Sequence, residues 1–424
     1  MKYVIIGASA AGINGAENLR ALDKNAEITL ISKDTEIYSR CILHHYIGNM
    51  RDVEGINFVD KDFFQKNNIN WMKGREVTSL DEVNKTITLD NNEVVTYDKV
   101  LIASGSRPFF PPIENINGKT NVVGLKSLDD CNTILELSKT SKNIVVVGAG
   151  LIGMDAVVGL LHNENVNAKI SLIEMADRLL PLQLDKEASL AYEAKMIEHG
   201  IDLHFTSKVT GLDVNPENDS LINGLYFETT REDRTDIEHI PADLVIVCAG
   251  VRPNIQFLEN TSINTDRLGL LFNPKGETNV KDVYGAGDVS GRGTIWSVAV
   301  KEGIAATSNM AGVERDMDDF FYAKSTMNFF DIPTLSLGCH SAFDKIEGLT
   351  IESIRERNGV YKKIAHKDGH IYGAIIQGDL AYTGVLAQLI RLYIDISKIK
   401  KSIFNIDYSD FFNIDAEQQF EYKD

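Results

Sequence analysis

Cysteine is scarce in this chain. Its 424 residues include only four cysteines, and none of them forms a C-x-x-C pair or has the paired spacing of a metal site. This wide spacing argues against a disulfide framework and against a zinc or iron–sulfur site. We therefore expect no bound metal, and any sulfur chemistry must rest on a single thiol. The four cysteines are Cys41, Cys131, Cys248 and Cys339.

Positive charge and long apolar runs are also in short supply. Lys and Arg number 43 against 61 Asp and Glu, and the resulting net charge of −18 at pH 7 argues against nucleic acid or an anionic membrane surface as the main partner. No apolar stretch approaches the ~20 residues that cross a bilayer. At the N-terminus, "MKYVIIGASAAG" has an unbroken large-apolar core of only Val4 to Ile6, which is shorter than the apolar region of a signal peptide. We expect a cytoplasmic protein with no membrane partner.

What the chain does have is a repeated pattern of strand, glycine loop, helix and strand. The pattern opens the chain as "KYVIIGASAAG", "INGAENLRAL" and "EITLIS", and it returns as "KNIVVVGAGLIGMDAVVGLL" followed by "KISLIEM". Each strand is a short β-branched run, and each helix begins at a loop of small residues. The repeat predicts an α/β protein with two Rossmann-like dinucleotide-binding domains. From about Ser325 the pattern changes to a β-hairpin around residues 367–369 and an amphipathic helix over residues 382–396, which predicts a third, α+β domain.

The second glycine loop, Gly148-Ala-Gly150-Leu-Ile-Gly153, has the full G-x-G-x-x-G pattern. The first glycine permits the turn, the second lets the backbone approach a pyrophosphate, and the third allows the helix to pack closely on the strand. The helix N-terminus adds free N–H groups and a positive dipole. Glu174 ends the next strand, where an acid hydrogen-bonds a ribose 2′-hydroxyl and repels a 2′-phosphate, so NADH is favoured over NADPH. The predicted contacts are Gly148, Gly150, Leu151, Ile152, Gly153 and Glu174.

The first glycine loop, Gly7-Ala-Ser9-Ala-Ala-Gly12, keeps the first and third glycines but has serine at the second. Serine is small enough to permit close backbone approach, so dinucleotide binding is still predicted. Ser32 stands where the ribose-binding acid is expected, and Asp34, two residues later, is the candidate to replace it. The predicted contacts here are Gly7, Ser9, Ala10, Ala11, Gly12, Ser32, Lys33 and Asp34.

A carboxylate follows another short strand, in "VYGAGDVS". Gly287-Asp288 lies between a strand and a helix, where a carboxylate can accept hydrogen bonds from a polyol such as ribitol. The helix would direct its positive N-terminal end at the same place, and beside a flavin this dipole would favour the anionic reduced ring. Two more strands end in small residues, in "YDKVLIASGSRP" and "PADLVIVCAGVRPN". Their ends supply the predicted contacts Ala103, Ser104, Gly105, Arg107 and Gly250.

The segments "VIIGASAAG", "ASGSRP", "VVVGAGLIG", "CAGVRPN" and "VYGAGDV" follow one another in the order and at the spacing of a known family. Residues 1–320 resemble the FAD-dependent pyridine nucleotide–disulfide oxidoreductases. The resemblance implies FAD on the first loop and at Asp288, and NADH on the second loop. It also implies a discontinuous FAD domain of residues 1–111 and 246–324, an NAD domain of residues 112–245, and a dimerisation-type C-terminal domain of residues 325–424. The chain departs from the family pattern at Ser9, Ser32 and Ser104, and at Asp155, where many relatives have glutamate.

The segment around Cys41, "Y-S-R-C-I-L-H-H-Y-I-G", combines two patterns within this family. The single cysteine and the residues after it resemble coenzyme A-disulfide reductases and NADH oxidases or peroxidases. The "Y-S-R" before it, and "G-A-I-I-Q-G-D" in the C-terminal domain, resemble NADH–rubredoxin reductases and the flavin module of nitrite reductases, which generally lack this cysteine. The first pattern predicts a redox-active thiol, and the second leaves Cys41 as a packing residue.

A redox-active Cys41 would lie beside the flavin at the start of a helix. A helix N-terminus lowers the pKa of a thiol, and Arg40 would add to this effect. The thiolate could attack a disulfide or persulfide, or be oxidised to a sulfenate and reduced again. His44 or His45 could donate a proton to the leaving thiol. The candidate catalytic residues are thus Cys41, Arg40 and His44, with Arg40 and Cys41 also as cofactor contacts, and the other cysteines are expected to pack.

The sequence therefore predicts an enzyme that passes hydride from NADH to FAD and then electrons, through Cys41, to a small disulfide, persulfide, peroxide or dioxygen. One alternative is electron transfer to a small redox protein such as rubredoxin, with Cys41 as a spectator. Another, of a different class, is a flavin-binding redox sensor or scaffold. Because the C-terminal domain usually forms a dimer interface in this family, the resemblance also implies a homodimer.

Overall fold

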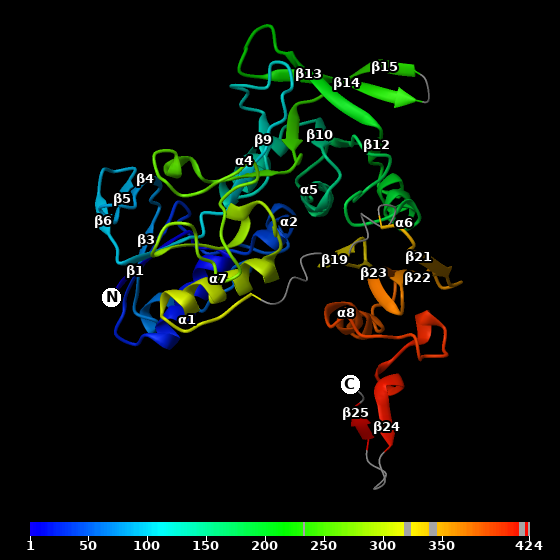
Figure 1. Cartoon of the computed structure of the whole chain (residues 1–424). Coiled ribbons are helices and arrows are strands. Elements are labelled where there is room, and N and C mark those ends of the chain that lie inside the picture. The colour runs from blue at the N-terminus through cyan, green and yellow to red at the C-terminus, as the bar shows by residue number, and fades with distance from the viewer. Residues whose placement is uncertain (232–233, 318–323, 339–345, 415–419, 423–424) are drawn as a thin grey trace.

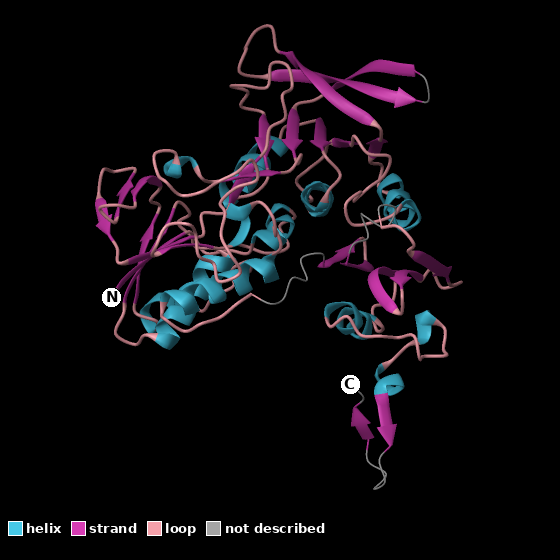
Figure 2. Cartoon of the chain, viewed as in Figure 1, coloured by secondary structure: helices cyan, strands magenta, loops and turns pink. Residues whose placement is uncertain are grey.

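The structure is a computed structural model of the chain (Figure 1), and it describes residues 1–231, 234–317, 324–338, 346–414 and 420–422. Within these residues, three sheets have five strands each (Figure 2). Two of the sheets are parallel and the third is antiparallel. This arrangement confirms the predicted α/β fold with a third, α+β part. No helix in the described part of the chain is both long and apolar enough to span a bilayer.

The first parallel sheet is completed by a segment that lies far along the chain from its other strands. In sheet order, its strands are β18 (Val283–Gly285), β7 (Lys99–Ile102), β1 (Lys2–Ile6), β2 (Glu27–Ser32) and β3 (Ile69–Lys73). Helices α1 (Ala10–Leu22) and α7 (Trp296–Met310) pack together beside it. Asn18 of α1 donates hydrogen bonds to Thr307 Oγ1 at 3.0 Å and Ser308 Oγ at 3.1 Å on α7. Strands β1 and β2 are buried on every residue but their first, as expected for a parallel sheet covered on both faces.

The second parallel sheet comes from the middle of the chain. In sheet order, its strands are β12 (Asp202–His204), β11 (Lys169–Ile173), β10 (Asn143–Val147), β16 (Leu244–Val247) and β9 (Val122–Gly124). The helices that pack against it are α4 (Leu128–Ser138), α5 (Leu151–His162) and α6 (Lys186–Glu198). Strand β16 crosses the predicted boundary between residues 245 and 246, and the domain boundaries themselves stay predictions.

Short antiparallel strands extend and connect these two sheets. Beside the first sheet are β4 (Val77–Asp81), β5 (Thr86–Leu89) and β6 (Val94–Thr96), and beyond the second are β13 (Ser207–Val214), β14 (Ile222–Arg231) and β15 (Arg234–Pro241) (Figure 1). The chain crosses between the sheets twice, through β8 (Ser106–Pro108) and β17 (Val251–Pro253). These two strands pair with each other in an antiparallel ladder, so the two parallel sheets are connected by a two-stranded ribbon.

The third sheet is antiparallel. In sheet order, its strands are β19 (Lys324–Phe329), β20 (Ile332–Gly338), β23 (His370–Gln377), β22 (Tyr361–Lys367) and β21 (Thr350–Arg355). The predicted hairpin around residues 367–369 is confirmed between β22 and β23. Helix α8 (Thr383–Arg391), which packs on β23, is shorter than the predicted 382–396. It ends there because Tyr393 has φ +49°, a left-handed conformation that no α-helix continues.

Short elements complete the described chain. They are η1 (Arg40–Ile42), α2 (Leu43–Ile47), α3 (Phe63–Lys66), η2 (Gln256–Leu258), η3 (Gly287–Ser290), η5 (Ile403–Asn405), η6 (Tyr408–Phe411), β24 (Phe412–Ile414) and β25 (Phe420–Tyr422). One buried apolar cluster joins α2 of the first unit to the second and third sheets, with Ile47 of α2, Met154 of α5 and Phe329 of β19 among its members. This common core fixes α2 against α5, and the candidate site lies around that contact.

Candidate functional site

The first glycine loop joins β1 to α1. Gly7 has φ +115°, and a Cβ at this residue would lie 2.1 Å from the carbonyl oxygen of Ala103. A Cβ at Gly12 would lie 1.8 Å from the carbonyl oxygen of Gly7. Ser9 is the N-cap of α1, but its side chain makes no capping hydrogen bond. The first turn, with Ala10 and Ala11 buried in it, therefore leaves its N–H groups to an anionic group, and the loop fits a pyrophosphate.

The side chains after β2 are engaged with one another. Ser32 is buried and donates a hydrogen bond to the carbonyl oxygen of Asp34 at 2.8 Å. The Asp34 carboxylate accepts hydrogen bonds from Tyr38 Oη and Arg40 Nη2, both at 2.7 Å. Lys33 is exposed in an ion pair of its own. The ribose contact expected of Asp34 stays a prediction. The carboxylate that would make this contact already forms an ion pair with Arg40.

The second glycine loop joins β10 to α5 and forms an open cradle. Gly148 has φ +105°, and a Cβ there would lie 2.6 Å from the carbonyl oxygen of Cys248. A Cβ at Gly153 would lie 1.9 Å from the carbonyl oxygen of Gly148. At Gly150, in contrast, a Cβ would meet no atom within 4 Å. The first and third glycines are therefore required by the protein itself, whereas the second borders open space at the N-terminus of α5. Leu151 and Ile152 form the first turn of this helix.

Glu174 closes back on the same loop. Its Oε2 accepts a hydrogen bond from the N–H of Ala149 at 2.7 Å, and its Oε1 accepts one from the N–H of Ala176 at 2.8 Å. Each carboxylate oxygen has a second lone pair, so the group can also accept from a ribose hydroxyl. The geometry therefore fits the expected nucleotide contact, which stays a prediction.

Asp288 lies in η3, directly after the first sheet, and it holds a lysine of the second unit. Its carboxylate accepts hydrogen bonds from Lys126 Nζ at 2.8 Å and from Ser106 Oγ at 3.1 Å. The side chains of Lys126 and Asp288 are only 17% and 19% exposed. Sequence reasoning gave Lys126 no role. The capping box of Ser127 and Asp130 marks the start of α4, but no local signal connects Lys126 to a carboxylate 162 residues away.

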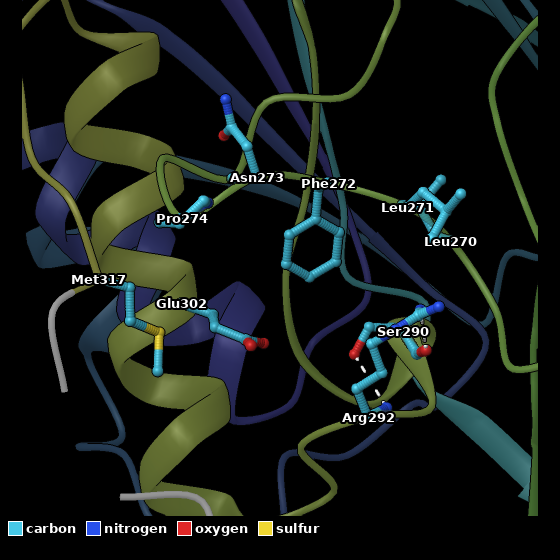
Figure 3. A pocket seen from close by; sticks show the side chains of 10 residues that line it. Leu270, Leu271, Phe272, Asn273, Pro274, Ser290, Arg292, Glu302 and Met317 are labelled. Atoms are coloured by element: carbon cyan, nitrogen blue, oxygen red, sulfur yellow. Dashed lines mark hydrogen bonds between the residues drawn. The ribbon is translucent and has the colours of Figure 1, made fainter. Parts of the chain in front are cut away.

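Behind the Asp288 turn is a cavity of about 200 Å³ (Figure 3). Glu302 of α7 points into it and faces Ser290 and Arg292, while its Oε2 accepts a hydrogen bond from the N–H of Gly287 at 2.7 Å. Burial raises the pKa of Glu302 to about 7; the Gly287 N–H lowers it and the charge of Asp288 raises it further. The rest of the lining is mostly apolar: Leu270, Leu271, Phe272, Asn273, Pro274, Gly276 and Met317.

The predicted contacts at the two crossings between the sheets hold those crossings together. Ser104 Oγ donates to the carbonyl oxygen of Asn254 at 2.7 Å, and Arg107 Nη1 donates to that of Pro253 at 2.9 Å. Gly105 and Gly250 have φ of +66° and +100°, and a Cβ at either would meet no atom within 4 Å. A direct cofactor contact for these four residues stays a prediction.

Cys41 differs from the other described cysteines in its exposure. It lies in η1, just before α2, and it is exposed, whereas Cys131 and Cys248 are buried as expected. Cys339 lies outside the described residues. Any thiol chemistry in the described part of the chain therefore falls to Cys41.

The charge around Cys41 is not what the sequence suggested. Although Cys41 is exposed, the protein atoms packed around its thiol exclude part of the solvent and so raise the pKa of the thiol; Asp155 and Asp288 raise it further, and Lys126 lowers it. The expected lowering by Arg40 and a helix N-terminus was therefore wrong. Arg40 is held by its ion pair with Asp34 and lies over the Tyr38 ring at 4.8 Å, and α2 has only five residues.

The two histidines after Cys41 have different environments. His44 Nδ1 lies 2.9 Å from Asp155 Oδ1 of α5. His45 packs edge-on against His44 with ring centroids 4.3 Å apart. Burial lowers the pKa of His45 to about 4, with further lowering from His44, Arg51 and His162. His45 is thus neutral near pH 7.

The structure brings five of these side chains together where the first and second units meet: Cys41, His44, Lys126, Asp155 and Asp288. Arg40 lies at the edge of this group, on Asp34. In the ranges that the structure describes, no group of three or more His, Cys, Asp or Glu residues could hold a metal ion.

Comparison with known proteins identifies the class. Residues 1–303 match the family described as "Pyridine nucleotide-disulphide oxidoreductase", and residues 324–393 match the "Rubredoxin NAD+ reductase C-terminal domain". The chain therefore belongs to the pyridine nucleotide-disulphide oxidoreductase family. It is an oxidoreductase, and FAD and NADH are the cofactors that this membership implies.

Individual relatives differ in what they are named for. The chain is 27% identical over 409 residues to the nitrite reductase [NAD(P)H] of Bacillus subtilis, covering 94% of this chain but only 48% of that protein. It is 28% identical over 316 residues to the NADH-rubredoxin oxidoreductase of Clostridium acetobutylicum, covering 73% of this chain and 75% of that one. The structure of an NAD-dependent persulfide reductase from A. fulgidus has the same fold, with a TM-score of 0.79 and 24% identity over 94% of this chain and 78% of that one. The chain thus spans about half the length of the curated nitrite reductase that it matches.

Proposed function

We propose that this chain is an NADH-dependent flavin oxidoreductase in which Cys41 reduces a small sulfur acceptor, a disulfide or a persulfide. A peroxide or dioxygen could be reduced through the same thiol. For a disulfide, one NADH and one proton yield NAD⁺ and two thiols. The observation that carries the proposal is the exposure of Cys41 at the junction of the two dinucleotide-binding units, beside the Lys126–Asp288 ion pair.

The residues that would hold the two cofactors are those of the glycine loops. FAD fits the first loop, with Gly7 and Gly12 against the sheet and Asp288 at the ribitol. Lys126, which pairs with Asp288, would either compete with the ribitol for this carboxylate or bind the ribitol together with it. NADH fits the second loop, with open space at Gly150 and the Glu174 carboxylate at the ribose. Two-electron transfer from NADH to the acceptor is the chemistry that bound FAD supplies.

The part of the chain's own residues in the reaction is sulfur exchange and proton transfer. Cys41 Sγ would form a bond to one sulfur of the acceptor, and the S–S bond of the acceptor would break. The departing sulfur takes a proton, for which His44 is the candidate donor. Two electrons then break the mixed disulfide, so that the second thiol leaves and the Cys41 thiol is restored. Because its pKa is raised, the Cys41 thiol needs Lys126 nearby as the cation that favours its thiolate form.

A second candidate is an electron-carrier reductase in which Cys41 is a spectator. Two observations favour it: the match of residues 324–393 to the rubredoxin reductase C-terminal domain, and the raised pKa of Cys41. Lys398, Lys400 and Lys401 form a short basic run that could dock an acidic carrier. Internal pairing reduces its charge, since Lys401 forms ion pairs with Asp407 and Asp410.

An anaerobic NADH titration followed by absorbance separates the two candidates. If Cys41 is a second redox centre, wild-type protein whose Cys41 has first been converted to the mixed disulfide with the acceptor, and then freed of excess acceptor, takes two equivalents of NADH, and Cys41→Ser given the same treatment takes one. Cys131→Ala, which changes a buried cysteine, is the matched control and keeps two. If wild type and Cys41→Ser both take one equivalent, Cys41 is a spectator and rubredoxin is the acceptor to test. Fast steady-state turnover with either acceptor would exclude the alternative of a redox sensor or scaffold.

A further inference from the structure

Helices α2 and α5 bring the first and second units into backbone contact (Figure 1). A Cβ added at Gly159 of α5 would lie 3.0 Å from the carbonyl oxygen of His44 and 3.1 Å from Ile47 Cβ. At the end of α5, Asn163 is buried and donates a hydrogen bond to the carbonyl oxygen of Ile47 at 2.7 Å. The position of each α5 side chain relative to α2 is therefore fixed.

Asp155 and His44 meet across this contact. His44 Nδ1 and Asp155 Oδ1 are 2.9 Å apart, and the two side chains are only 16% and 20% exposed. Burial raises the pKa of Asp155, and the contact with His44 lowers it. A buried carboxylate needs a proton or a neighbouring positive charge. Nδ1 of His44 is the nitrogen beside it, at a short distance but without the alignment of a hydrogen bond.

The pair lies within electrostatic reach of Cys41. The charge of Asp155 raises the pKa of the Cys41 thiol, and two residues separate Cys41 from His44 in the chain. Nδ1 of His44 lies beside Asp155, so Nε2 is the ring nitrogen that remains for proton exchange. His45, the other titratable group against the ring, is neutral near pH 7.

We propose that Asp155 is a positioning residue whose charge beside His44 Nδ1 favours the proton on that nitrogen, so that Nε2 gives the proton to the sulfur that leaves during exchange at Cys41. This inference rests on the proposed sulfur chemistry. As Cys41 Sγ bonds to one acceptor sulfur, the other leaves with the electron pair of the broken S–S bond and takes the proton from Nε2. His44 is then neutral with its remaining proton on Nδ1, which is the tautomer that a carboxylate at Nδ1 stabilises. Solvent returns the proton to Nε2 before the next turnover.

The same helix carries the nucleotide loop. α5 begins at Leu151, directly after its N-cap Gly150, and Asp155 follows about 6 Å further along the helix axis. A nucleotide bound at the loop and the carboxylate that orients His44 are therefore carried by one rigid element. The position of the nucleotide, which supplies the hydride, and that of His44, which supplies the proton, therefore both depend on how α5 packs against α2.

NMR of labelled imidazole nitrogens in the FAD-bound protein tests this inference without any acceptor. In the wild-type protein, the neutral form of the His44 ring should carry its proton on Nδ1. In Asp155→Asn the Nδ1–H fraction should fall, because the charge that stabilises it is gone, and Asp155→Glu should restore it. The matched control is Asp213→Asn, which removes the carboxylate from another pair, His239–Asp213 at 3.1 Å on β15 and β13, and leaves the His44 signal unchanged. An unchanged tautomer in Asp155→Asn overturns the proposal.

Turnover supplies the second readout. With a disulfide acceptor, Asp155→Asn should lower kcat by about 10- to 100-fold with a smaller change in KM for NADH, as for loss of an oriented general acid. Asp155→Glu should recover most of that loss. If Asp155→Asn does not retain its flavin, Asp155→Ser, smaller and also neutral, carries the same two expectations. If Asp155→Asn changes the His44 tautomer but the wild-type protein reduces no disulfide, the positioning role of Asp155 stands and the proposed acceptor is refuted. If the wild-type protein reduces disulfides but Asp155→Asn leaves the tautomer unchanged, the proposed acceptor stands and the positioning role is refuted.

Discussion

Replacing Glu302 by glutamine tests the electrostatics behind the Asp288 turn. Glu302 is 7% exposed, and burial raises its pKa from an ordinary 4.5 to about 7. The difference corresponds to about 3 kcal/mol of folding free energy, at about 1.4 kcal/mol for each tenfold change in proton affinity. Glutamine retains an oxygen that can accept the Gly287 N–H, but it has no charge at any pH.

The sign follows from proton binding. The folded protein holds the Glu302 proton more tightly than the unfolded chain does. The stability that this proton supplies is fully present below pH about 4.5, and it is lost as the pH rises through about 7. Wild type should therefore lose about 3 kcal/mol between pH 5 and pH 8.5 that Glu302→Gln does not lose. For a chain of this size, roughly 1 to 2 °C of Tm per kcal/mol gives a relative stabilisation of the variant by a few degrees at pH 8.5.

The assay is thermal unfolding of the FAD-bound proteins by circular dichroism, at both pH values and one scan rate. Glu314→Gln is the matched control, because Glu314 is exposed in an ion pair with Lys275 and should change Tm by less than a degree, as surface pairs are worth about 0–1 kcal/mol. If the Tm of Glu302→Gln falls between pH 5 and pH 8.5 as much as that of wild type, Glu302 does not titrate in this range and the reasoning is refuted.

Three further predictions, made with four substitutions, concern the loops and the attachment of the third sheet. Gly12→Ala places a Cβ 1.8 Å from the Gly7 carbonyl oxygen and should yield protein without the visible absorbance of FAD. Gly150→Ala, in contrast, should keep FAD and raise KM for NADH. Equal flavin content in the two variants would contradict this account. Glu174→Gln should reduce the preference for NADH over NADPH by about 10-fold in kcat/KM, because it removes the charge that repels a 2′-phosphate; an unchanged ratio would place specificity elsewhere. Tyr361→Phe removes a 2.8 Å hydrogen bond to Asp185 Oδ2 and should cost about 1 kcal/mol in the free energy of unfolding. A neutral result would mean that Lys363, which donates to the same oxygen, satisfies it without Tyr361.

The sequence predicted those features whose cause lies within a few consecutive residues. The G-x-G-x-x-G loop is required because a Cβ at Gly148 or Gly153 would overlap a carbonyl oxygen, and this constraint is complete within one strand, loop and helix. The hairpin at residues 367–369 is likewise local. The order of such motifs was enough to predict the two parallel sheets and the family, since each motif forms the same local structure wherever it occurs. The length of α8 was overestimated because nothing in its apolar pattern signals the left-handed Tyr393.

The sequence by itself therefore determined the two dinucleotide-binding folds, the cofactors that they imply and the single candidate thiol. Only the tertiary structure decided the chemistry around that thiol. Lys126 reaches Asp288, and His44 reaches Asp155, through contacts between elements far apart in the chain. The one charge that sequence proximity placed beside Cys41, that of Arg40, is held by Asp34 instead. The physical reason is that steric rules for a loop act between neighbours in sequence, whereas a pKa depends on burial and on charges that act through space.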